Sequence, residues 1–308
     1  MRRSKLEIRD TADQLILGDS VEKLKSLPDE SVHLILSDIP YGISFADWDV
    51  LHSNTNSALG GISPAQLKSR GGFKSRGKPI NGWSEADRRI PLEYQQWCST
   101  WAGTWLRLLK PGASCFVFAG RRYAHRAIVA LEDAGFNLRD IISWNKAHGT
   151  LKAQRISKVY ERRHDTKNSA RFEGWRVGNL RPVFEPILWF VKPYKQGGTI
   201  ADNMLQYGVG AYDLEAWMKY VPDGSNHIEI PNDLSDRGLH PTQKPLRLME
   251  ALIELTTQAD QVVLDPFAGS GTTLLAAQRL GRHYIGVEVN SEYFGIAQQR
   301  LAQISLFD

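Results

Sequence analysis

An acid, a proline and an aromatic ring come directly after an apolar run: residues 32–36 read VHLIL, and Asp38, Pro40 and Tyr41 follow. The run, bounded by turn formers, predicts a strand buried on both faces, as parallel sheets require. Pro40 cannot donate to a sheet ladder and Gly42 tolerates unusual dihedral angles, so the chain leaves the sheet there in a defined turn. Because open α/β sheets bind ligands at the carboxyl ends of their strands, we expect Asp38 to lie at a ligand site.

A second stretch, VVLDPFAGSGTT at residues 262–273, predicts a strand, a glycine turn and a helix. Gly269 and Gly271 allow the turn to pass close to a ligand, and the helix that follows offers free backbone amides. A phosphate loop would have lysine where Thr272 stands. A dinucleotide fingerprint would have glycine or alanine where Leu274 stands. The turn therefore matches neither of these two familiar motifs.

Two further acids end predicted strands. Glu288 comes seventeen residues after Gly271, about where an acid holds ribose hydroxyls in such folds. Asp19 ends the strand LILGD in a comparable way and could meet an adenine edge. Each acid could instead cap the N-terminus of a helix. For Asp19, which precedes Ser20, this alternative is nearly as favoured as the role in ligand binding.

The elements that position these residues alternate between strand and helix. Short apolar runs predict seven strands, at residues 14–19, 32–38, 114–120, 138–144, 182–191, 262–265 and 283–289. Helical signals predict helices over 20–27, 122–134 and 244–257, one that Pro91 starts and residues 110–112 stop, one that ends at Gly281, and one from Ser291. This alternation predicts an α/β protein with a doubly wound, mostly parallel seven-stranded sheet.

Trp97, Trp101 and Trp105 fall four residues apart within the helix predicted after Pro91. This spacing places the three indole rings on one face of that helix. A stripe of this kind favours a core position over a platform for stacking bases.

Composition places limits on the class of protein. The 308 residues include 42% hydrophobic and 23% charged side chains, which is typical of a soluble globular protein. No apolar run approaches the ~20 residues of a membrane helix, and the start, MRRSKLEIRD, shows no export signal. Cys98 and Cys115 alone can form neither a disulfide framework nor a zinc site. We expect a cytoplasmic protein with no metal and no membrane partner.

Charge is distributed unevenly along the chain. Residues 43–90 show the apolar period of neither a strand nor a helix, which predicts a mobile loop insertion. Within this insertion, residues 68–78 hold five Lys or Arg and no acid. Residues 144–195 hold twelve Lys or Arg against four acids, whereas 196–239 hold two against seven. A local basic surplus is typical of contact with a phosphate backbone, although a solvated face is the commoner meaning of a charge run.

Three ordered motifs resemble those of the S-adenosylmethionine-dependent DNA amino-methyltransferases, in the β-arrangement of that family. DPFAGSGTT resembles its cofactor loop, Asp38-Ile39-Pro40-Tyr41 resembles its catalytic Asp/Asn/Ser-Pro-Pro-Tyr/Phe tetrad, and HPTQKPLRL, from His240, is similar to the segment before the loop. The resemblance implies a single Rossmann-like methyltransferase domain over 1–308. It also allows a homodimer and implies a bacterial or phage-infected host cell.

The resemblance also assigns roles to particular residues. Asp38, Pro40 and Tyr41 would be catalytic, with Ile39 departing from the proline of the motif. The residues implied for S-adenosylmethionine are Asp19, Asp38, Thr242, Lys244, Asp265, Phe267, Ala268, Gly269, Ser270, Gly271, Thr272 and Glu288.

The expected reaction is transfer of a methyl group to the N6 amine of a flipped-out adenine in double-stranded DNA, because the tetrad opens with aspartate. The first alternative is the N4 amine of cytosine. The second is a cofactor-binding nucleic-acid protein without catalysis, in which Ile39 spoils the turn.

DNA recognition is expected in three segments: the loop insertion 43–90, which faces DNA, and residues 145–182 and 196–239. Because 196–239 is acidic, we assign contacts with the DNA backbone to residues 144–182 and to the stretch 68–78, and we expect 196–239 at most to read bases. The candidate contacts are Lys68, Arg70, Lys74, Arg76, Lys78, Arg162, Arg163, Arg171 and Arg176.

Neutralising the five basic side chains of residues 68–78 is expected to weaken DNA binding and to flatten its dependence on salt, because each phosphate contact releases counterions. The affinity for S-adenosylmethionine should stay unchanged. Binding isotherms at several salt concentrations measure both effects. An unaltered salt dependence would assign this stretch to an ordinary solvated surface.

Overall fold

The structure, a computed structural model, describes residues 12–41, 85–146, 153–231 and 243–304. The basic stretch 68–78, with its five candidate DNA contacts, lies outside these ranges, as does Thr242. Parts of the three predicted recognition segments also fall outside them.

One mostly parallel sheet of eight strands forms the centre of the molecule. In sheet order its strands are β1 (Gln14–Leu17), β10 (His283–Glu288), β9 (Val262–Asp265), β2 (Val32–Asp38), β3 (Leu109–Phe118), β7 (Phe184–Val191), β4 (Asn137–Asn145) and β8 (His227–Glu229). Strand β7 runs antiparallel to both of its neighbours, β3 and β4, and the other pairs are parallel. The first and last strands of the chain, β1 and β10, therefore pair directly with each other.

The seven strands predicted from apolar runs are all present, and the sheet gains an eighth strand at its edge, β8. This strand has three residues, of which only Ile228 is buried. Three residues are too few to show a strand period in the sequence, and tertiary pairing with β4 decides the strand. The doubly wound, mostly parallel α/β fold predicted from the sequence is confirmed.

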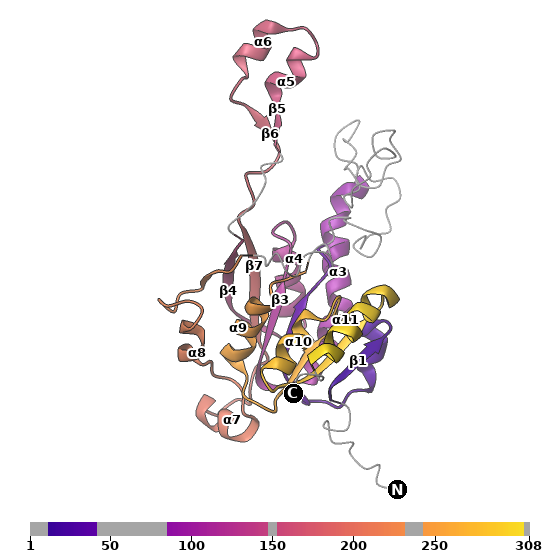
Figure 1. The fold of residues 1–308 in the computed structure, drawn as a ribbon, viewed down its shortest axis with the longest axis vertical. Helices are drawn as coiled ribbons and strands as arrows, with labels where there is room; N and C mark the ends of the chain where they lie inside the picture. The colour runs from indigo at the N-terminus through magenta and orange to yellow at the C-terminus, as the bar shows by residue number, and fades with distance from the viewer. Residues whose placement is uncertain (1–11, 42–84, 147–152, 232–242, 305–308) are drawn as a thin grey trace.

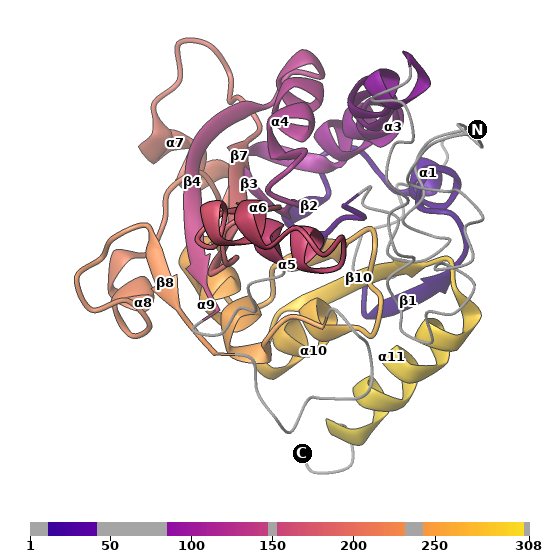
Figure 2. The ribbon, with the colours of Figure 1, turned by 90° about the horizontal axis from the view of Figure 1, so that it is seen from above.

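Helices cover both faces of the sheet, as the two views in Figures 1 and 2 show. The face with the tryptophan-rich core carries α1 (Ser20–Lys23), the short 3₁₀ helix η2 (Leu24–Ser26), α3 (Glu85–Leu108) and α4 (Ala124–Asp133). The other face carries α8 (Leu214–Met218), α9 (Leu246–Thr256), α10 (Thr272–Arg279) and α11 (Ser291–Ile304). Each face has its own apolar cluster, so the sheet is buried on both sides and its carboxyl edge stays free for a site.

Helix α3 begins at Glu85, not at Pro91, and the predicted start and the predicted end of the loop insertion at residue 90 are therefore wrong. Pro91 lies within the helix, in its second turn. A proline there removes one hydrogen bond of the helix, a loss that packing on the core side can offset. The tryptophan stripe is core, as predicted: Trp101 and Trp105 are fully buried.

A basic arm leaves the sheet between β4 and β7. It consists of the two-stranded ribbon β5 (Gln154–Arg155) and β6 (Arg176–Val177) with helices α5 (Ile156–Glu161) and α6 (Thr166–Arg171) at its end. Figure 1 shows these helices standing well clear of the body, and Figure 2 shows them above the carboxyl edge of the sheet. By contrast α7 (Ile200–Tyr207) lies at the end of the molecule opposite to the arm, where the side chain of Asn203 donates to the carbonyl of Pro111 at 2.9 Å.

Replacing Trp105 by alanine should destabilise the fold by about 3–5 kcal/mol, the usual cost of truncating a buried aromatic side chain. Its ring is fully buried and lies 4.1 Å from Trp101 between ring centroids. Chemical denaturation measures the loss. Leu205 is the control, because its side chain is 89% exposed and its replacement by alanine should change stability by less than about 0.5 kcal/mol. Equal costs would contradict the assignment of this stripe to the core.

Candidate active site

The catalytic and cofactor-loop candidates meet at the carboxyl edge because β2 and β9 are neighbours. The two strands pair in parallel, with Ile35 opposite Leu264. Beyond that pair, the hydroxyl of Ser37 donates to Asp265 Oδ1 at 2.7 Å, across 228 residues of sequence. Asp38, which follows Ser37, therefore lies close to Asp265, the last residue before the glycine turn.

Asp38 ends β2, and its carboxylate forms an ion pair with Lys244, which precedes α9. The ion pair and hydrogen bond join Lys244 Nζ to Asp38 Oδ2. The Lys244 side chain is only 4% exposed and the Asp38 side chain 24%. The other carboxylate oxygen, Oδ1, is buried and accepts no hydrogen bond within the described part of the chain. One oxygen of Asp38 is thus held and the other still lacks a donor.

Pro40 and Tyr41 are fixed by neighbouring elements. The hydroxyl of Tyr94, on α3, donates to the carbonyl of Pro40 at 3.0 Å. The hydroxyl of Tyr41 donates to Glu185 Oε2 at 3.3 Å. Gly120 leaves room for the Tyr41 ring, because a side chain there would come within 3.0 Å of Tyr41 Cβ. The turn after β2 is therefore held at each end by a side chain from another element.

Glu185 and Lys146 complete this cluster, and neither was predicted from the sequence. Lys146 forms an ion pair with Glu185 Oε1, and Lys244 Nζ lies 4.0 Å from Glu185 Oε2. Glu185 stands near the start of β7, and because β7 is antiparallel, its start lies at the carboxyl edge of its neighbours. The one sequence signal was an acid followed by Pro186 in an otherwise apolar strand.

Aromatic rings surround the Lys244 ammonium. Its Nζ lies 5.3 Å from the centre of the Tyr41 ring and 5.2 Å from that of Phe118, which ends β3. Lys146 Nζ lies 4.7 Å from the Trp144 ring. Contact with the face of a ring stabilises a cation that has lost its water.

Burial and charge act in opposite directions on the acids. Burial raises the pKa of Asp38, and Lys244 opposes that rise. Burial alone would also raise the pKa of Glu185, but Lys244 and Lys146 together bring it below its usual value. Burial lowers the pKa of Lys146, which Glu185 opposes. The cluster therefore favours an ionised Glu185 and leaves Asp38 as the group whose protonation changes more readily.

Hydrogen bonds to the buried Asp265 fix the conformation of the glycine turn. Asp265 Oδ1 also accepts from the backbone amide of Phe267 at 3.1 Å. Burial raises the pKa of Asp265 to about 6. Gly269 and Gly271 both have positive φ, at +52° and +79°, and a Cβ at Gly269 would meet no atom within 4 Å in the described ranges. The turn thus offers a free surface next to Asp38, while the Phe267 ring packs 5.7 Å from Trp97 of α3.

Glu288 ends β10, where it pairs with Leu17, the last residue of β1, and Asp19 follows Leu17 by two residues. Glu288 accepts backbone hydrogen bonds from Gly269 and Asn290, both at 2.7 Å. Burial raises the pKa of Glu288. Asp19 caps α1, where its Oδ1 accepts from the amides of Val21 at 2.8 Å and Glu22 at 3.3 Å. The N-cap alternative considered for Asp19 is therefore observed.

The helix side of the turn is fixed by Arg300, which the sequence did not suggest. This buried side chain of α11 donates to the carbonyl of Ser270 at 2.7 Å and to Thr272 Oγ1 at 3.1 Å. Ser270 Oγ in turn donates to Gln243 Oε1 at 3.5 Å. Ala268 is buried and bonded to the carbonyl of Val287 at 2.9 Å. Most of the predicted loop residues therefore shape the turn.

Four predicted arginines lie apart from this cluster. Arg162, Arg163, Arg171 and Arg176 lie on the arm, all of them exposed. Lys244 contacts Asp38, and its predicted contact with the cofactor stays a prediction.

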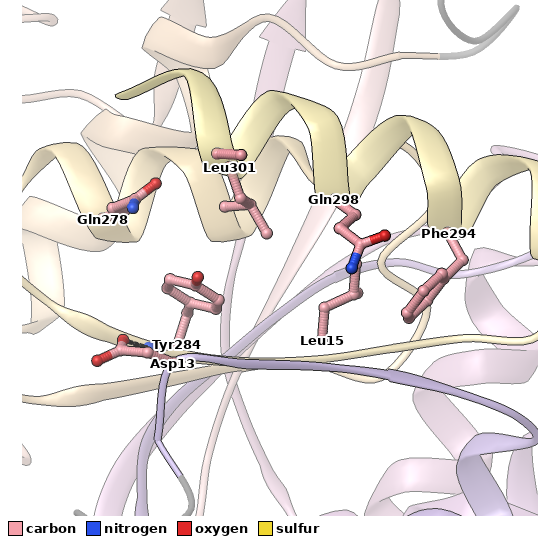
Figure 3. A pocket seen from close by; sticks show the side chains of 8 residues that line it. Asp13, Leu15, Gln278, Tyr284, Phe294, Gln298 and Leu301 are labelled. Carbon is pink, nitrogen blue, oxygen red and sulfur yellow. Dashed lines mark hydrogen bonds between the residues drawn. The ribbon is translucent and has the colours of Figure 1, made fainter. Parts of the chain in front are cut away.

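A separate hollow of about 340 Å³ lies between α11 and the edge formed by β1 and β10 (Figure 3). Leu15, Tyr284, Phe294 and Gln298 line it, with Asp13 at its rim. It lies toward the amino ends of these strands, and none of the predicted site residues lines it. We assign no chemistry to this hollow.

Within the described ranges, no cluster of three or more His, Cys, Asp or Glu side chains has the arrangement of a metal site. The same ranges contain no helix with the length and apolar character needed to span a bilayer.

Comparisons with known proteins agree with this arrangement. The chain matches the family model described as DNA methylase over residues 32–299. It is 54% identical over 294 residues to the type II methyltransferase M.HindIII of Haemophilus influenzae, which covers 94% of this chain and 95% of that protein. It is 27% identical over 301 residues to the type II methyltransferase M.HinfI of the same species, covering 97% and 71%.

Two solved structures resemble it in fold. The PvuII DNA methyltransferase (cytosine-N4-specific) superposes with a TM-score of 0.60 at 21% identity, covering 93% of this chain and 85% of that chain. The M1.HpyAVI-SAM complex superposes with a TM-score of 0.53 at 23% identity, covering 94% and 98%. At these identities the likeness concerns the fold alone, and it confirms the methyltransferase fold predicted above.

Replacing Gly271 by alanine should destabilise the protein more than the same change at Gly281. Both glycines have positive φ, +79° and +67°, which costs an alanine about 1–2 kcal/mol. At Gly271 the new Cβ would also lie 2.9 Å from that of Ala297, whereas a Cβ at Gly281 would meet no atom of the described residues within 4 Å. Urea unfolding of the two variants measures the difference. Equal losses would mean that α11 does not press on the turn.

Proposed function

The chain belongs to the family of DNA methylases, and from that premise we propose that it transfers a methyl group from S-adenosylmethionine to the exocyclic N6 amine of a flipped-out adenine in double-stranded DNA. The observation that carries the proposal is Asp38, a partly buried acid close to Asp265 of the glycine turn, one of whose oxygens lacks a donor among the described residues.

Asp38 and Pro40 would prepare the amine for transfer. An exocyclic amine is a poor nucleophile, because its lone pair is delocalised into the base. If Asp38 Oδ1 and the carbonyl of Pro40 each accept one N–H, the nitrogen is held out of conjugation and aimed at the methyl group. Tyr94 already donates to the Pro40 carbonyl, but a carbonyl oxygen has a second lone pair for the base.

Tyr41 would receive the base. A base inside a duplex is out of reach, and extruding it costs a few kcal/mol. The Tyr41 ring lies beside Asp38 and is supported at its hydroxyl by Glu185. Stacking on that ring would recover part of the cost, at a position where the amine reaches Asp38.

The residues of the glycine turn suit S-adenosylmethionine. The space over Gly269 is open, and the amide nitrogen Nε2 of Gln243 is buried without a partner in the described part of the chain. Glu288 accepts one hydrogen bond at each oxygen and keeps lone pairs for ribose hydroxyls. Asp19 uses only Oδ1 for its cap among the described contacts, which leaves Oδ2 for an adenine edge. The bound cofactor would supply a methyl group on a positively charged sulfur.

Carbon methylation of cytosine is disfavoured by the cysteines. That reaction uses a cysteine nucleophile, typically after proline, and here Cys98 follows Trp97 and Cys115 follows Ser114. Both thiols are fully buried in the core, and burial raises the pKa of each. A thiol that cannot ionise readily is a poor nucleophile. The N4 amine of cytosine stays the alternative target, because Asp38 could hold either exocyclic amine.

The basic arm would contact DNA from above the site. Residues 153–183 hold eight Lys or Arg and three acids, and they extend over the edge that carries Asp38. Such a surface favours the phosphate backbone. Because the relatives are type II methyltransferases, we propose that this chain acts at a specific site, as the methylating partner in a restriction-modification pair.

DNA incubated with the protein and S-adenosylmethionine, then digested to nucleosides, should contain N6-methyldeoxyadenosine, which chromatography with mass detection identifies. N4-methyldeoxycytidine would select the cytosine alternative. Cofactor and DNA binding without any methylated nucleoside would select the non-catalytic alternative.

In the same assay, Asp38→Ala should slow methyl transfer by roughly hundredfold or more, since a positioned hydrogen-bonding group is lost. Asp133→Ala is the matched control, because Asp133 is exposed at the end of α4 and should be replaceable without effect. A rate for Asp38→Ala close to that of the control would contradict the assignment of Asp38.

A further inference from the structure

We propose that Lys244 is a positioning residue for methyl transfer, whose ammonium group holds Oδ2 of Asp38 and keeps the carboxylate ionised, so that Oδ1 is left for the target amine. The proposal rests on the proposed function, in which Asp38 accepts an N–H of that amine. It gives Lys244 a role toward the base, in place of the contact with the cofactor that the sequence suggested.

Lys244 is placed by burial and by four partners. Its side chain is 4% exposed, so the ammonium has lost nearly all of its water. Asp38 and Glu185 supply negative charge, and the Tyr41 and Phe118 rings face it at 5.3 and 5.2 Å. A buried ammonium without such partners would be strongly unfavourable. The cation is therefore bound at a fixed place instead of moving freely at the surface.

The two carboxylate oxygens of Asp38 differ in their hydrogen bonds. Oδ2 accepts from Lys244, whereas Oδ1 is buried and has no donor in the described part of the chain. A buried acceptor without a donor is unfavourable by about 1–3 kcal/mol. An exocyclic N–H would provide the missing donor. Because Lys244 holds Oδ2, the carboxylate cannot rotate freely, and the lone pairs of Oδ1 keep a fixed orientation.

The charge of Asp38 also depends on Lys244. Burial raises the pKa of Asp38, Glu185 adds to the rise, and Lys244 is the main group that opposes it. The hydroxyl of Tyr41 lies close enough to Asp38 to oppose the rise as well, and Lys146 and Asp265 are further titratable groups that interact with Asp38. Only the ionised carboxylate can accept with both oxygens, because the protonated acid uses one for its own proton. Removing Lys244 would thus leave a protonated Asp38 over a wider pH range.

Glu185 links Lys244 to the base-stacking ring. It lies 4.0 Å from Lys244 and accepts from the Tyr41 hydroxyl at 3.3 Å. Lys146 on its other side keeps Glu185 compensated when Lys244 is removed. A Lys244 variant should therefore affect Asp38 more than Glu185, which makes the test specific.

The test is the pH profile of methyl transfer by Lys244→Met, measured under single-turnover conditions with the protein in excess over DNA, from about pH 5 to about pH 9. Asp38 must be ionised to accept the amine, so activity falls as the pH drops through its pKa. In the variant this acid limb should move to higher pH by about one unit or more, which gives about tenfold slower transfer below the limb. Transfer should recover at high pH.

Two further variants separate positioning from a structural role. Lys244→Arg keeps the charge and should keep the acid limb at the wild-type pH, even if the rate is lower. Lys219→Met removes an exposed lysine that pairs with Glu254 on the other face, and it should match the wild type throughout. A Lys244→Met profile lowered equally at every pH would overturn the proposal.

Direct titration of the Asp38 carboxyl by carbon NMR, with Asp38→Asn to identify its signal, reads the same ionisation without turnover. Its midpoint should rise in Lys244→Met, and an unchanged midpoint would overturn the proposal. If the wild type transfers no methyl group, the proposed function fails while this titration still tests the pairing. If it transfers and Lys244→Met keeps the wild-type limb, only the role of Lys244 fails.

Discussion

Compensation between two acids and two cations, of which Lys244 is buried and Lys146 partly buried, is the interaction at the carboxyl edge on which the candidate active site depends. Asp38 and Glu185 are brought close together by β2 and β7, the two strands that flank β3, and two carboxylates at such a distance would otherwise favour protonation of one of them. Lys244 contacts both, and Lys146 neutralises Glu185 from the far side. Breaking one pair leaves a buried charge uncompensated, which is far less favourable than the loss of a surface ion pair.

Strand order creates this meeting. Strand β2 lies between β9 and β3, and so the end of an early strand stands next to the glycine turn of a late one. The antiparallel direction of β7 then places Glu185 at the same edge, although it stands near a strand's beginning. Strands β2, β3 and β7 thereby direct Asp38, Phe118 and Glu185 to one place, and Lys146 joins them directly after β4. The sheet that contains these strands is packed on both faces.

The same edge is shaped by elements with no chemistry of their own. The tryptophan stripe of α3 is core, yet Trp97 also packs against Phe267 in the glycine turn. Tyr94, one turn earlier in the same helix, bonds to the carbonyl of Pro40. A single helix, α3, therefore supports both the turn after β2 and the glycine turn. The basic arm extends from β4 and β7 above these two turns. Cofactor, base and DNA backbone would thus be brought together along one edge of the sheet.

The sequence by itself determined seven strands, the glycine turn, the core stripe and the position of Asp38 at a strand end, because apolar periodicity and turn residues report burial and direction within a few neighbouring residues. Only the tertiary structure decided that Lys244 pairs with Asp38, that Glu185 and Lys146 belong to the cluster, that Asp19 caps a helix and that α3 continues through Pro91. The bond between Lys244 and Asp38 spans 206 residues, and that between Tyr41 and Glu185 spans 144. Contacts of that range depend on the order and direction of strands, which no local pattern contains.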